Sequence, residues 1–495
     1  MTLGQLMAGA KLRAPLPEEA AALEVLGLDY DSRRTGEKYV FFAFHGARSD
    51  GREFAEEARR RGAVATVSEL PRHPAYSGLW IEVEEARRAM AVAAKRFYDS
   101  PDERLTLTGV TGTNGKTTTT FLLDSILRAA GLRTALISTI EYQVAGEVRP
   151  AVNTTPESLD LHRLFSELAQ KAGSHATMEV SSHALALGRV HGLRFHTAVF
   201  TNLTQDHLDF HSTMEDYFAA KDLLFRGAGA PPPRFAVVNQ DDPASRRLRT
   251  SPETSVLRYG LRNGAGLRPI RVSSGFDGLR FEICHEHGRI PVRSSMLGGM
   301  NVYNILAACG AALTLGISPE AISAGISACH SVPGRFERIQ AGQPYLVIVD
   351  YAHTDNALRN LIAAARELDP KRVITVFGCG GDRDRSKRPH MAEAAAEGSD
   401  FVILTSDNPR TEEPLNIIND ALVGLRRHNV RHAVEPDRGR AIRLGLEEAR
   451  RGDIVLIAGK GHETYQILGD KVVPFDDRAV ARGILRELGY GEAQS

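Results

Sequence analysis

The feature that most constrains the fold of this chain is an alternation of short apolar runs with amphipathic stretches, from about residue 105 onward. Short apolar runs predict buried strands, and apolar residues at helical spacing predict helices that cross back over a parallel sheet. We therefore predict an α/β fold. The runs expected to form strands are 105–110, 175–180, 197–202, 235–239, 345–350, 372–377, 401–404 and 454–458.

Two interruptions of this pattern predict three domains. The first hundred residues hold short mixed elements and a helical stretch at 84–98, which Ser100-Pro101 ends. A turn-rich joint follows at 331–334. We expect domains at 1–100, 101–332 and 333–495, and at roughly 150 residues per domain the length of 495 residues agrees with three.

Charge and cysteine content exclude several classes of protein. Lys and Arg number 61, as do Asp and Glu, so no positive surplus favours nucleic acid or anionic lipid. The four cysteines lack a CxxC pair, which favours a reducing cytoplasm. No basic residue precedes the apolar start, so we expect no export signal. The longest apolar run, 306–317, is shorter than the about 20 residues that span a bilayer. We expect a cytoplasmic protein without membrane or nucleic-acid partners.

A turn rich in small residues follows the first predicted strand of the central domain and precedes a helical pattern. Backbone N–H groups at such a turn face a phosphate, while a lysine holds the outer phosphates and a threonine binds magnesium. Val110 stands where the strict pattern has glycine, so this loop is a variant. Because the chain lacks the Asn-Lys-x-Asp element of guanine recognition, we expect ATP. The loop comprises Gly112, Thr113, Asn114, Gly115, Lys116, Thr117 and Thr118.

Two other predicted strands end in polar side chains. Glu179 ends an otherwise apolar run, where a carboxylate is either a charge at the sheet edge or a metal ligand, and the pattern leaves both open. Segment 201–211 is dense in potential magnesium and phosphate ligands. His207 and His211 have the spacing of a zinc pair, but the glutamate of HExxH is absent, which disfavours a zinc hydrolase.

Lys221 has apolar neighbours at helical spacing, namely Tyr217, Phe218, Leu224 and Phe225. A helix would turn this lysine inward. Burial lowers the pKa of an amine, and a neutral amine can react with carbon dioxide to form a carbamate. Spacing alone favours the alternative, in which the stem is buried and the ammonium reaches solvent.

In their order along the chain, these motifs resemble the Mur ligases of peptidoglycan synthesis. GTNGKT (112–117), MEVSSH (178–183), segment 201–211 with Lys221, NVYN (301–304) and DYAHT (350–354) carry the resemblance. It extends from about residue 27 to residue 478. DSR (31–33), NTTP (153–156), DNPR (407–410) and GKGHE (459–463) resemble those family members that add the third residue of the peptide.

The resemblance implies an N-terminal domain that holds the UDP end of the substrate, a central ATPase domain and a Rossmann-like C-terminal domain that brings the amino acid. Ser32 would contact the uridine end, with 45–47 nearby. Thr117, Glu179, His207 and a carbamylated Lys221 would organise magnesium. The muramoyl dipeptide is assigned to Asn153, Thr154, Thr155, Ser181 and Arg189, and the nucleotide also to Asn301, Asn304, Asp350 and His353.

The implied activity is an ATP-dependent amide ligation. The γ-carboxylate of D-glutamate in a UDP-N-acetylmuramoyl dipeptide becomes an acyl phosphate, and an amine displaces phosphate. Lys116, Glu179, His207 and Lys221 are the implied catalytic residues, and we expect a monomer. Leu187 replaces a glutamine that touches substrate in some relatives. Asp355 stands where the family usually has proline, and a helix N-terminus accepts an aspartate well.

We expect the added amino acid to be meso-2,6-diaminopimelate, with L-lysine or L-ornithine as alternatives. Its distal carboxylate requires a guanidinium, from Arg410 with Arg383, and its ammonium requires acids, from Glu463 with Asp407. Rival functions are a folylpolyglutamate-type ligase, which DSR and DNPR disfavour, and a nucleotide-binding protein without catalysis. The expected crevice comprises Arg383, Asp407, Asn408, Pro409, Arg410, Gly459 and Glu463, which all follow predicted strands.

Overall fold

The structure, a computed structural model, describes residues 1–46 and 49–491 and divides into two compact units. The N-terminal unit contains residues 1–268, 284–289 and 303–325, and the C-terminal unit contains 269–283, 290–302 and the chain from 326 onward. Parallel sheets with crossover helices confirm the predicted α/β class. The domain boundaries near residues 100 and 332 stay predictions.

The first hundred residues form a parallel four-stranded sheet of β1 (Gly27–Asp29), β2 (Tyr39–Ala43), β3 (Ala65–Ser68) and β4 (Trp80–Glu82), in that order. Helix α4 (Ala86–Phe97) confirms the helical stretch predicted at 84–98 and packs on the apolar core of this sheet. Pro101 also begins α5 (Pro101–Arg104), because the first helical turn needs no N–H there. The remaining helices are α1 (Leu3–Met7), α2 (Glu18–Ala21), η1 (Ser32–Arg34), η2 (Gly51–Phe54) and α3 (Ala55–Arg60).

An eight-stranded central sheet has the order β12-β11-β10-β5-β9-β6-β7-β8. The β6-β7 and β7-β8 pairs are antiparallel, and the other neighbours are parallel. Strand β5 therefore ends between the carboxyl ends of β9 and β10, which is where ligands bind in such sheets. The strands are β5 (Thr106–Thr111), β6 (Thr134–Ile137), β7 (Glu141–Val144), β8 (Glu147–Pro150), β9 (His175–Glu179), β10 (Phe195–Phe200), β11 (Phe235–Asn239) and β12 (Ser255–Tyr259).

Close packing of helices around this sheet depends on small residues. A Cβ at Gly310 of α10 would lie 2.8 Å from Val237 of β11, and one at Gly325 of α11 would lie 2.3 Å from the Cα of Ile126. Helix α10 contains most of the longest apolar run, and none of the helices in 1–46 and 49–491 is long and apolar enough to cross a membrane. The helices are α6 (Lys116–Ala129), α7 (Ser158–Gln170), α8 (Ser182–Ala186), α9 (Met214–Arg226), η3 (Pro243–Arg247), α10 (Gly299–Thr314) and α11 (Pro319–Ala328).

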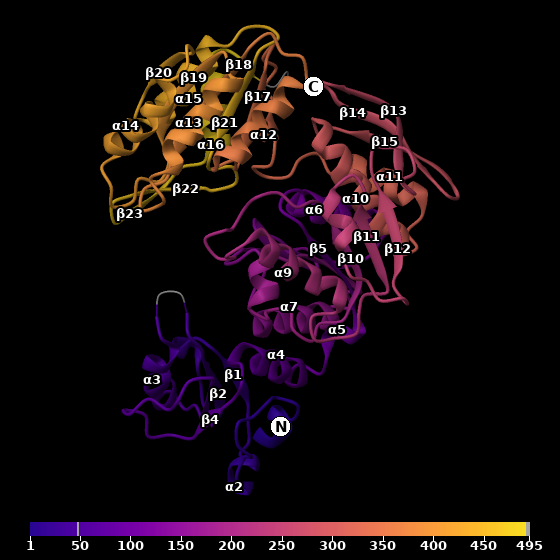
Figure 1. The fold of residues 1–495 in the computed structure, drawn as a ribbon, viewed down its shortest axis with the longest axis vertical. Coiled ribbons are helices and arrows are strands. Elements are labelled where there is room, and N and C mark those ends of the chain that lie inside the picture. Colours follow the sequence, from indigo (N-terminus) through magenta and orange to yellow (C-terminus); the bar gives the residue numbers. More distant parts are fainter. Residues whose placement is uncertain (47–48, 492–495) are drawn as a thin grey trace. The chain divides into compact units, whose positions relative to one another are not determined.

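The C-terminal sheet has the order β16-β17-β21-β18-β19-β20, and its pairs are parallel except β16-β17. Helices α12 to α14 cover one face and α15 and α16 the other (Figure 1). The strands are β16 (Glu337–Ile339), β17 (Leu346–Asp350), β18 (Val373–Cys379), β19 (Phe401–Ser406), β20 (Arg431–Val434), β21 (Ile454–Ala458) and the hairpin β22 (Tyr465–Leu468) and β23 (Lys471–Pro474). The helices are α12 (Asp355–Arg366), α13 (Lys387–Gly398), α14 (Pro414–Leu425), α15 (Arg438–Glu448) and α16 (Asp477–Glu487).

Sequence analysis missed a three-stranded sheet of β13 (Arg268–Gly275), β14 (Gly278–His285) and β15 (Gly288–Ser294). Its signal was alternation, since Leu279, Phe281 and Ile283 of β14 are buried at every second position. Short turns join the three strands, so no crossover helix accompanies them.

Candidate active site

The predicted phosphate-binding loop lies between β5 and α6, and two of its glycines fit where a side chain could not. Gly112 has φ +146°, and a Cβ there would lie 1.9 Å from Oγ1 of Thr201. Gly115 has φ +84°, and its Cβ would lie 2.3 Å from Oδ1 of Asn304. Helix α6 begins directly after Gly115, which offers no side-chain cap, so the N–H groups of its first turn favour an anion.

Lys116 folds back over this loop. Its Nζ donates to the carbonyl oxygens of Gly112 at 3.0 Å and of Thr113 at 2.8 Å. Thr117 and Thr118 follow in the first turn of α6 and are buried. The lysine and the helix N-terminus therefore lie on the same loop, as phosphate binding requires.

The segment after β10 braces the loop. Oδ1 of Asn202 accepts from the N–H of Asn114 at 2.9 Å, and Nδ2 of Asn202 donates to the carbonyl of Asn114 at 3.1 Å. The N–H of Thr204 donates to Oγ1 of Thr113 at 3.0 Å. Sequence analysis treated 201–211 as a ligand-rich loop and missed this bracing role. The available signal was position, because both segments follow predicted parallel strands.

Lys221 of α9 is buried, with 1% of its surface exposed, which confirms that it faces inward. Its Nζ donates to the carbonyl of Gly112 at 2.7 Å and lies 4.3 Å from the centre of the Tyr217 ring. Burial and then the charge of Lys116 lower the pKa of Lys221 well below its usual value, against an opposing effect of Asp206. The alternative, an ammonium that reaches solvent, is wrong.

His207 lies in the loop after β10 with φ +54°. Its ring centre is 4.8 Å from that of His183 and 6.0 Å from that of Tyr217. Burial lowers the pKa of His207, and Asp206, whose Oδ2 is 3.6 Å from Nε2, partly offsets this. The neutral imidazole that results is the form that binds a metal.

Glu179 is buried at the end of β9, an interior strand, so it is not a charge at the sheet edge. Its carboxylate accepts from the N–H of Thr139 at 2.7 Å and from its hydroxyl at 3.1 Å. In the β5-β9 register it lies opposite Val110, just before the phosphate-binding loop. Within the described ranges, no three His, Cys, Asp or Glu side chains gather as a metal site.

The residues assigned to the dipeptide form a connected group beside Glu179. Oγ1 of Thr155 donates to the carbonyl of Glu179 at 2.9 Å and accepts from the N–H of Ser181 at 3.1 Å. Arg189 donates to the carbonyl of Thr155 at 3.0 Å and pairs with Glu157 at 2.9 Å. This buried acid, Glu157, was missed by sequence analysis.

Two further residues of that assignment lie in the loop after β8. Oγ1 of Thr154 accepts from the hydroxyl of Thr139 at 3.1 Å, and Thr139 is also a hydrogen-bond partner of Glu179. Asn153 is exposed, and its backbone N–H and carbonyl both bond to the hydroxyl of Tyr142.

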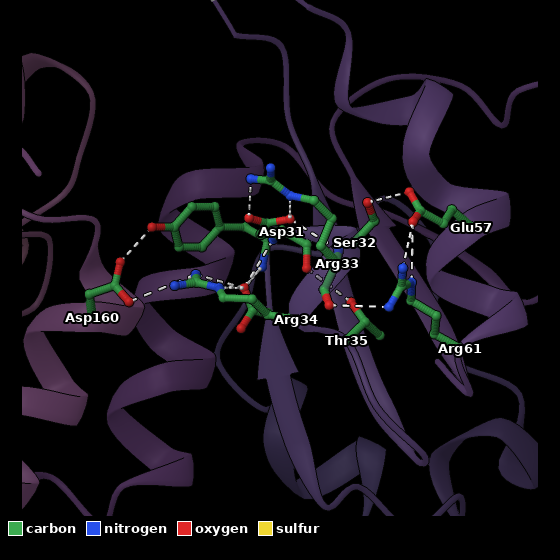
Figure 2. A network of polar contacts seen from close by, with 10 residues as sticks. Asp31, Ser32, Arg33, Arg34, Thr35, Glu57, Arg61 and Asp160 are labelled. Atoms are coloured by element: carbon green, nitrogen blue, oxygen red, sulfur yellow. Dashed lines mark hydrogen bonds and ion pairs between the residues drawn. The ribbon is translucent and has the colours of Figure 1, made fainter. Parts of the chain in front are cut away.

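The DSR motif follows β1 and forms the turn η1 (Figure 2). The hydroxyl of buried Ser32 donates to Glu57 at 2.8 Å, and Asp31 caps the turn by accepting from the N–H of Arg33. The Tyr30 hydroxyl donates to Asp160 of α7 at 2.5 Å. The turn is thus tied to the helix that follows the dipeptide loop. Residue 47 of the segment expected near Ser32 lies outside the described residues.

The residues assigned to the nucleotide lie at two places. On α10, Asn301 donates to the carbonyl of Leu297 at 2.8 Å, and Asn304 lies against Gly115. In the C-terminal unit, Asp350 accepts from the N–H groups of Phe336 and Ala352, at 2.7 and 2.8 Å. Burial raises the pKa of Asp350. Nearby, Nδ1 of exposed His353 is 2.8 Å from the carbonyl of Tyr351.

Several residues predicted to line the amino-acid crevice lie close together at the ends of β18, β19 and β21. A Cβ at Gly459 would lie 2.6 Å from Oδ2 of Asp407. A Cβ at Gly380 would lie 3.1 Å from Nη1 of Arg410 and 3.7 Å from Cγ of Arg383, so both arginines lie beside the same glycine. Arg410 also donates to the carbonyl of Gly381 at 2.7 Å.

Lys460 is a residue of this crevice that sequence analysis missed. Its fully buried Nζ donates to Glu463 at 2.9 Å and to Oδ1 of Asn408 at 3.2 Å. Nδ2 of Asn408 donates to the same carboxylate at 3.0 Å. Glu463 therefore already has a cationic partner, and a substrate ammonium would share it. The available signal was the lysine within GKGHE.

Comparison with known proteins gives full-length matches. Residues 24–98 match the profile "Mur ligase family, catalytic domain", 110–312 match "Mur ligase middle domain", and 334–461 match "Mur ligase, glutamate ligase domain". A protein of Solibacter usitatus named UDP-N-acetylmuramoyl-L-alanyl-D-glutamate--2,6-diaminopimelate ligase is 61% identical over 494 residues, 100% of both chains. One of the same name from Geobacillus kaustophilus is 47% identical and covers 94% of this chain and 96% of its own.

Solved structures of other proteins have a similar fold. A structure titled with the same ligase name has a TM-score of 0.70 and 32% identity, over 99% of this chain and 100% of that one. The folylpolyglutamate synthase of Mycobacterium tuberculosis has a TM-score of 0.60 at 18% identity, over 81% of this chain and 95% of its own, and shares the fold alone.

Proposed function

Because the chain belongs to the Mur ligase family, we propose that it is the ATP-dependent ligase that joins meso-2,6-diaminopimelate to UDP-N-acetylmuramoyl-L-alanyl-D-glutamate in peptidoglycan precursor synthesis. The observation that carries the proposal is that Arg383 and Arg410 lie beside Gly380 and Asp407 lies beside Gly459, in a chain that also has a phosphate-binding loop before α6. Full-length identity of 61% to a ligase of that name supports the substrate pair.

The loop residues would carry the phosphoryl transfer. The γ-carboxylate of D-glutamate attacks the terminal phosphorus of ATP, the bond to ADP breaks, and an acyl phosphate forms. Lys116 and the first turn of α6 stabilise the charge that develops on the phosphate oxygens. The amine of the amino acid then attacks the acyl carbon, phosphate leaves, and the amine loses a proton.

The donor set near the loop fits magnesium. Mg²⁺ prefers oxygen ligands and binds few protein carboxylates beside nucleotide phosphates, and Thr117 and Glu179 offer oxygen atoms at the loop and at the end of the neighbouring strand β9. Thr117, Glu179 and His207 would hold it, and a carbamate on Lys221 would add a carboxylate. Bound there, the ion would neutralise phosphate charge.

Carbamylation of Lys221 is supported by its burial and by its lowered pKa. The neutral Nζ attacks the carbon of carbon dioxide, a C–N bond forms, and one proton leaves the nitrogen. The product is a carboxylate on the buried face of α9, beside the carbonyl of Gly112.

Substrate binding divides along the chain. Residues 1–100, with Ser32, would hold the UDP end. Residues 101–332 would hold ATP and the dipeptide, the latter through Asn153, Thr154, Thr155, Ser181 and Arg189. Residues 333–495 would bring the amino acid, and Asp350 and His353 would reach the nucleotide with Asn301 and Asn304. We also propose that the protein acts as a monomer in the cytoplasm.

The deciding experiment measures ADP release with UDP-muramoyl dipeptide and, in turn, meso-diaminopimelate, L-lysine and L-ornithine. We expect release with diaminopimelate above the other two. Equal or faster turnover with lysine would contradict the amino-acid assignment. Turnover only with a folate and glutamate would favour a folylpolyglutamate-type ligase, and no turnover with any acceptor would favour nucleotide binding without catalysis.

A further inference from the structure

Arg438, the first residue of α15, carries a fully buried guanidinium in the C-terminal unit. Its Nε and Nη2 donate to the two carboxylate oxygens of Asp477, both at 2.7 Å. Neither side chain is exposed. Burying such a pair costs desolvation that roughly cancels the attraction, so stability alone does not account for it.

The other donors of this guanidinium reach two strand ends. Nη1 donates to the carbonyl of Ser406 at 3.3 Å, and Nη2 donates to the carbonyl of Ala458 at 3.0 Å. Ser406 ends β19 and Ala458 ends β21. Because a peptide unit is planar, a fixed carbonyl also fixes the peptide from which the next residue departs. Those next residues are Asp407 and Gly459.

Strands β19 and β21 do not pair with each other, since β18 lies between them. Each strand is hydrogen-bonded to β18, but no ladder hydrogen bond joins β19 to β21, and Arg438 links their ends directly. The fit across this gap is tight, because a Cβ at Gly459 would lie 2.6 Å from Oδ2 of Asp407. A small change of spacing would open or close the crevice at that point.

The charges around Arg438 also connect it to the residues at these strand ends. Burial lowers the pKa of Arg438, but the carboxylates of Asp477, Asp407 and Glu463 outweigh burial and raise it. Two of these three acids belong to the crevice. The buried cation therefore also offsets the repulsion between carboxylates that converge there.

We propose that Arg438 is a positioning residue for the amino-acid substrate, which clamps the ends of β19 and β21 so that Asp407 and Gly459 present one binding surface. This inference rests on the proposed function. Arg438 need not touch substrate. Lysine cannot replace it, because a single ammonium lacks the planar fork that serves Asp477 and two carbonyls together.

The test is Arg438→Lys, with Arg372→Lys as the matched control. Arg372 pairs with Asp453 at 2.7 Å, just before β18 and β21 begin, so it is an arginine–aspartate pair at the opposite end of the same sheet. We expect Arg438→Lys to raise KM for diaminopimelate about tenfold or more, with KM for ATP and for the UDP-dipeptide unchanged. Arg372→Lys should alter none of the three KM values.

Asp477→Asn provides a second variant, in which Arg438 keeps its two carbonyl contacts but loses its charge partner. It should raise the same KM by a smaller factor. An unchanged KM for diaminopimelate in both variants, or equal rises in all three KM values, would overturn the clamp. A wild-type enzyme that releases no ADP with diaminopimelate would instead overturn the proposed function.

Discussion

The carbonyl oxygen of Gly112 accepts hydrogen bonds from two lysines, at 2.7 Å from Nζ of Lys221 and at 3.0 Å from Nζ of Lys116. Two ammonium groups on one oxygen repel each other, and Lys221 is the more deeply buried. Burial and this repulsion both favour its neutral form. The buried amine of Lys221 thus lies against the backbone of the loop that we propose binds phosphate.

Replacing Lys221 by alanine should abolish ADP release, because the carbamate carboxylate is lost with the amine. A short carboxylic acid such as acetate should restore part of the activity by occupying the space left. Lys171→Ala, at a surface lysine paired with Glu147 and Glu167, should need no rescue. A crystallographic map that shows a bare ammonium at Lys221 in an active preparation would contradict carbamylation.

Lys116→Ala should lower the rate of ADP release by about a hundredfold or more, because one preorganised donor to the developing phosphate charge is removed. Lys116 donates two hydrogen bonds to carbonyl oxygens of its own loop, and the variant loses both. Urea unfolding checks the fold. A folded variant with near wild-type release would show that the phosphate-loop assignment is wrong.

Arg410→Ala should lower kcat/KM for diaminopimelate at least about thirtyfold, since an unpaired distal carboxylate costs on the order of 2 kcal/mol or more. Activity with lysine should change little. Arg385→Ala is the control, because Arg385 follows the neighbouring strand β18 and pairs with Asp420 at the surface. If Arg410→Ala kept the preference for diaminopimelate, another residue would select the amino acid.

Stability should fall in acid because of His162, which is fully buried on α7. Neither ring nitrogen has a hydrogen-bond partner among the described residues, and burial lowers the pKa of His162 to about 4, against an opposing effect of Asp102. The unfolded chain binds this proton near its usual pKa of about 6.5, and the folded chain does not. The contribution of His162 to stability is therefore complete above its unfolded pKa of about 6.5 and is lost as the pH falls toward 4.

Between about pH 7.5 and about pH 5, His162 should remove about 2 kcal/mol of the free energy of unfolding. Urea titrations of wild type and His162→Leu at both pH values measure this difference, because other titrating groups act on both proteins alike. Equal losses in the two proteins would show that His162 titrates normally.

Local patterns were sufficient for much of the fold and for the residue types of the site. The spacing of Tyr217, Phe218, Leu224 and Phe225 predicted the inward direction of Lys221, because helix geometry fixes neighbours within one turn. Apolar runs likewise predicted β11 and β21, since buried parallel strands have little polar content.

What the sequence could not supply was the pairing of side chains that lie far apart along the chain. Asn202 contacts Asn114 across 88 positions, and Lys460 contacts Asn408 across 52. Each is an ordinary polar residue in its own segment, and only the strand order brings the partners together. The sheet of β13 to β15 was missed for a different reason. Its buried and exposed side chains alternate, as in an antiparallel sheet, in a region where we expected strands joined by crossover helices.

The hydrogen bonds described for Asp407, Asn408, Arg410, Lys460 and Glu463 all close within the C-terminal unit. If these residues select the amino acid as we propose, that selection is carried by one unit of the chain. A chimaera that receives this unit from a lysine-adding relative should take over the donor's preference for the amino acid, while the phosphate-binding loop with Lys116 and Thr117 stays that of the recipient. The third residue of the cell-wall peptide would then be open to exchange by recombination of whole segments.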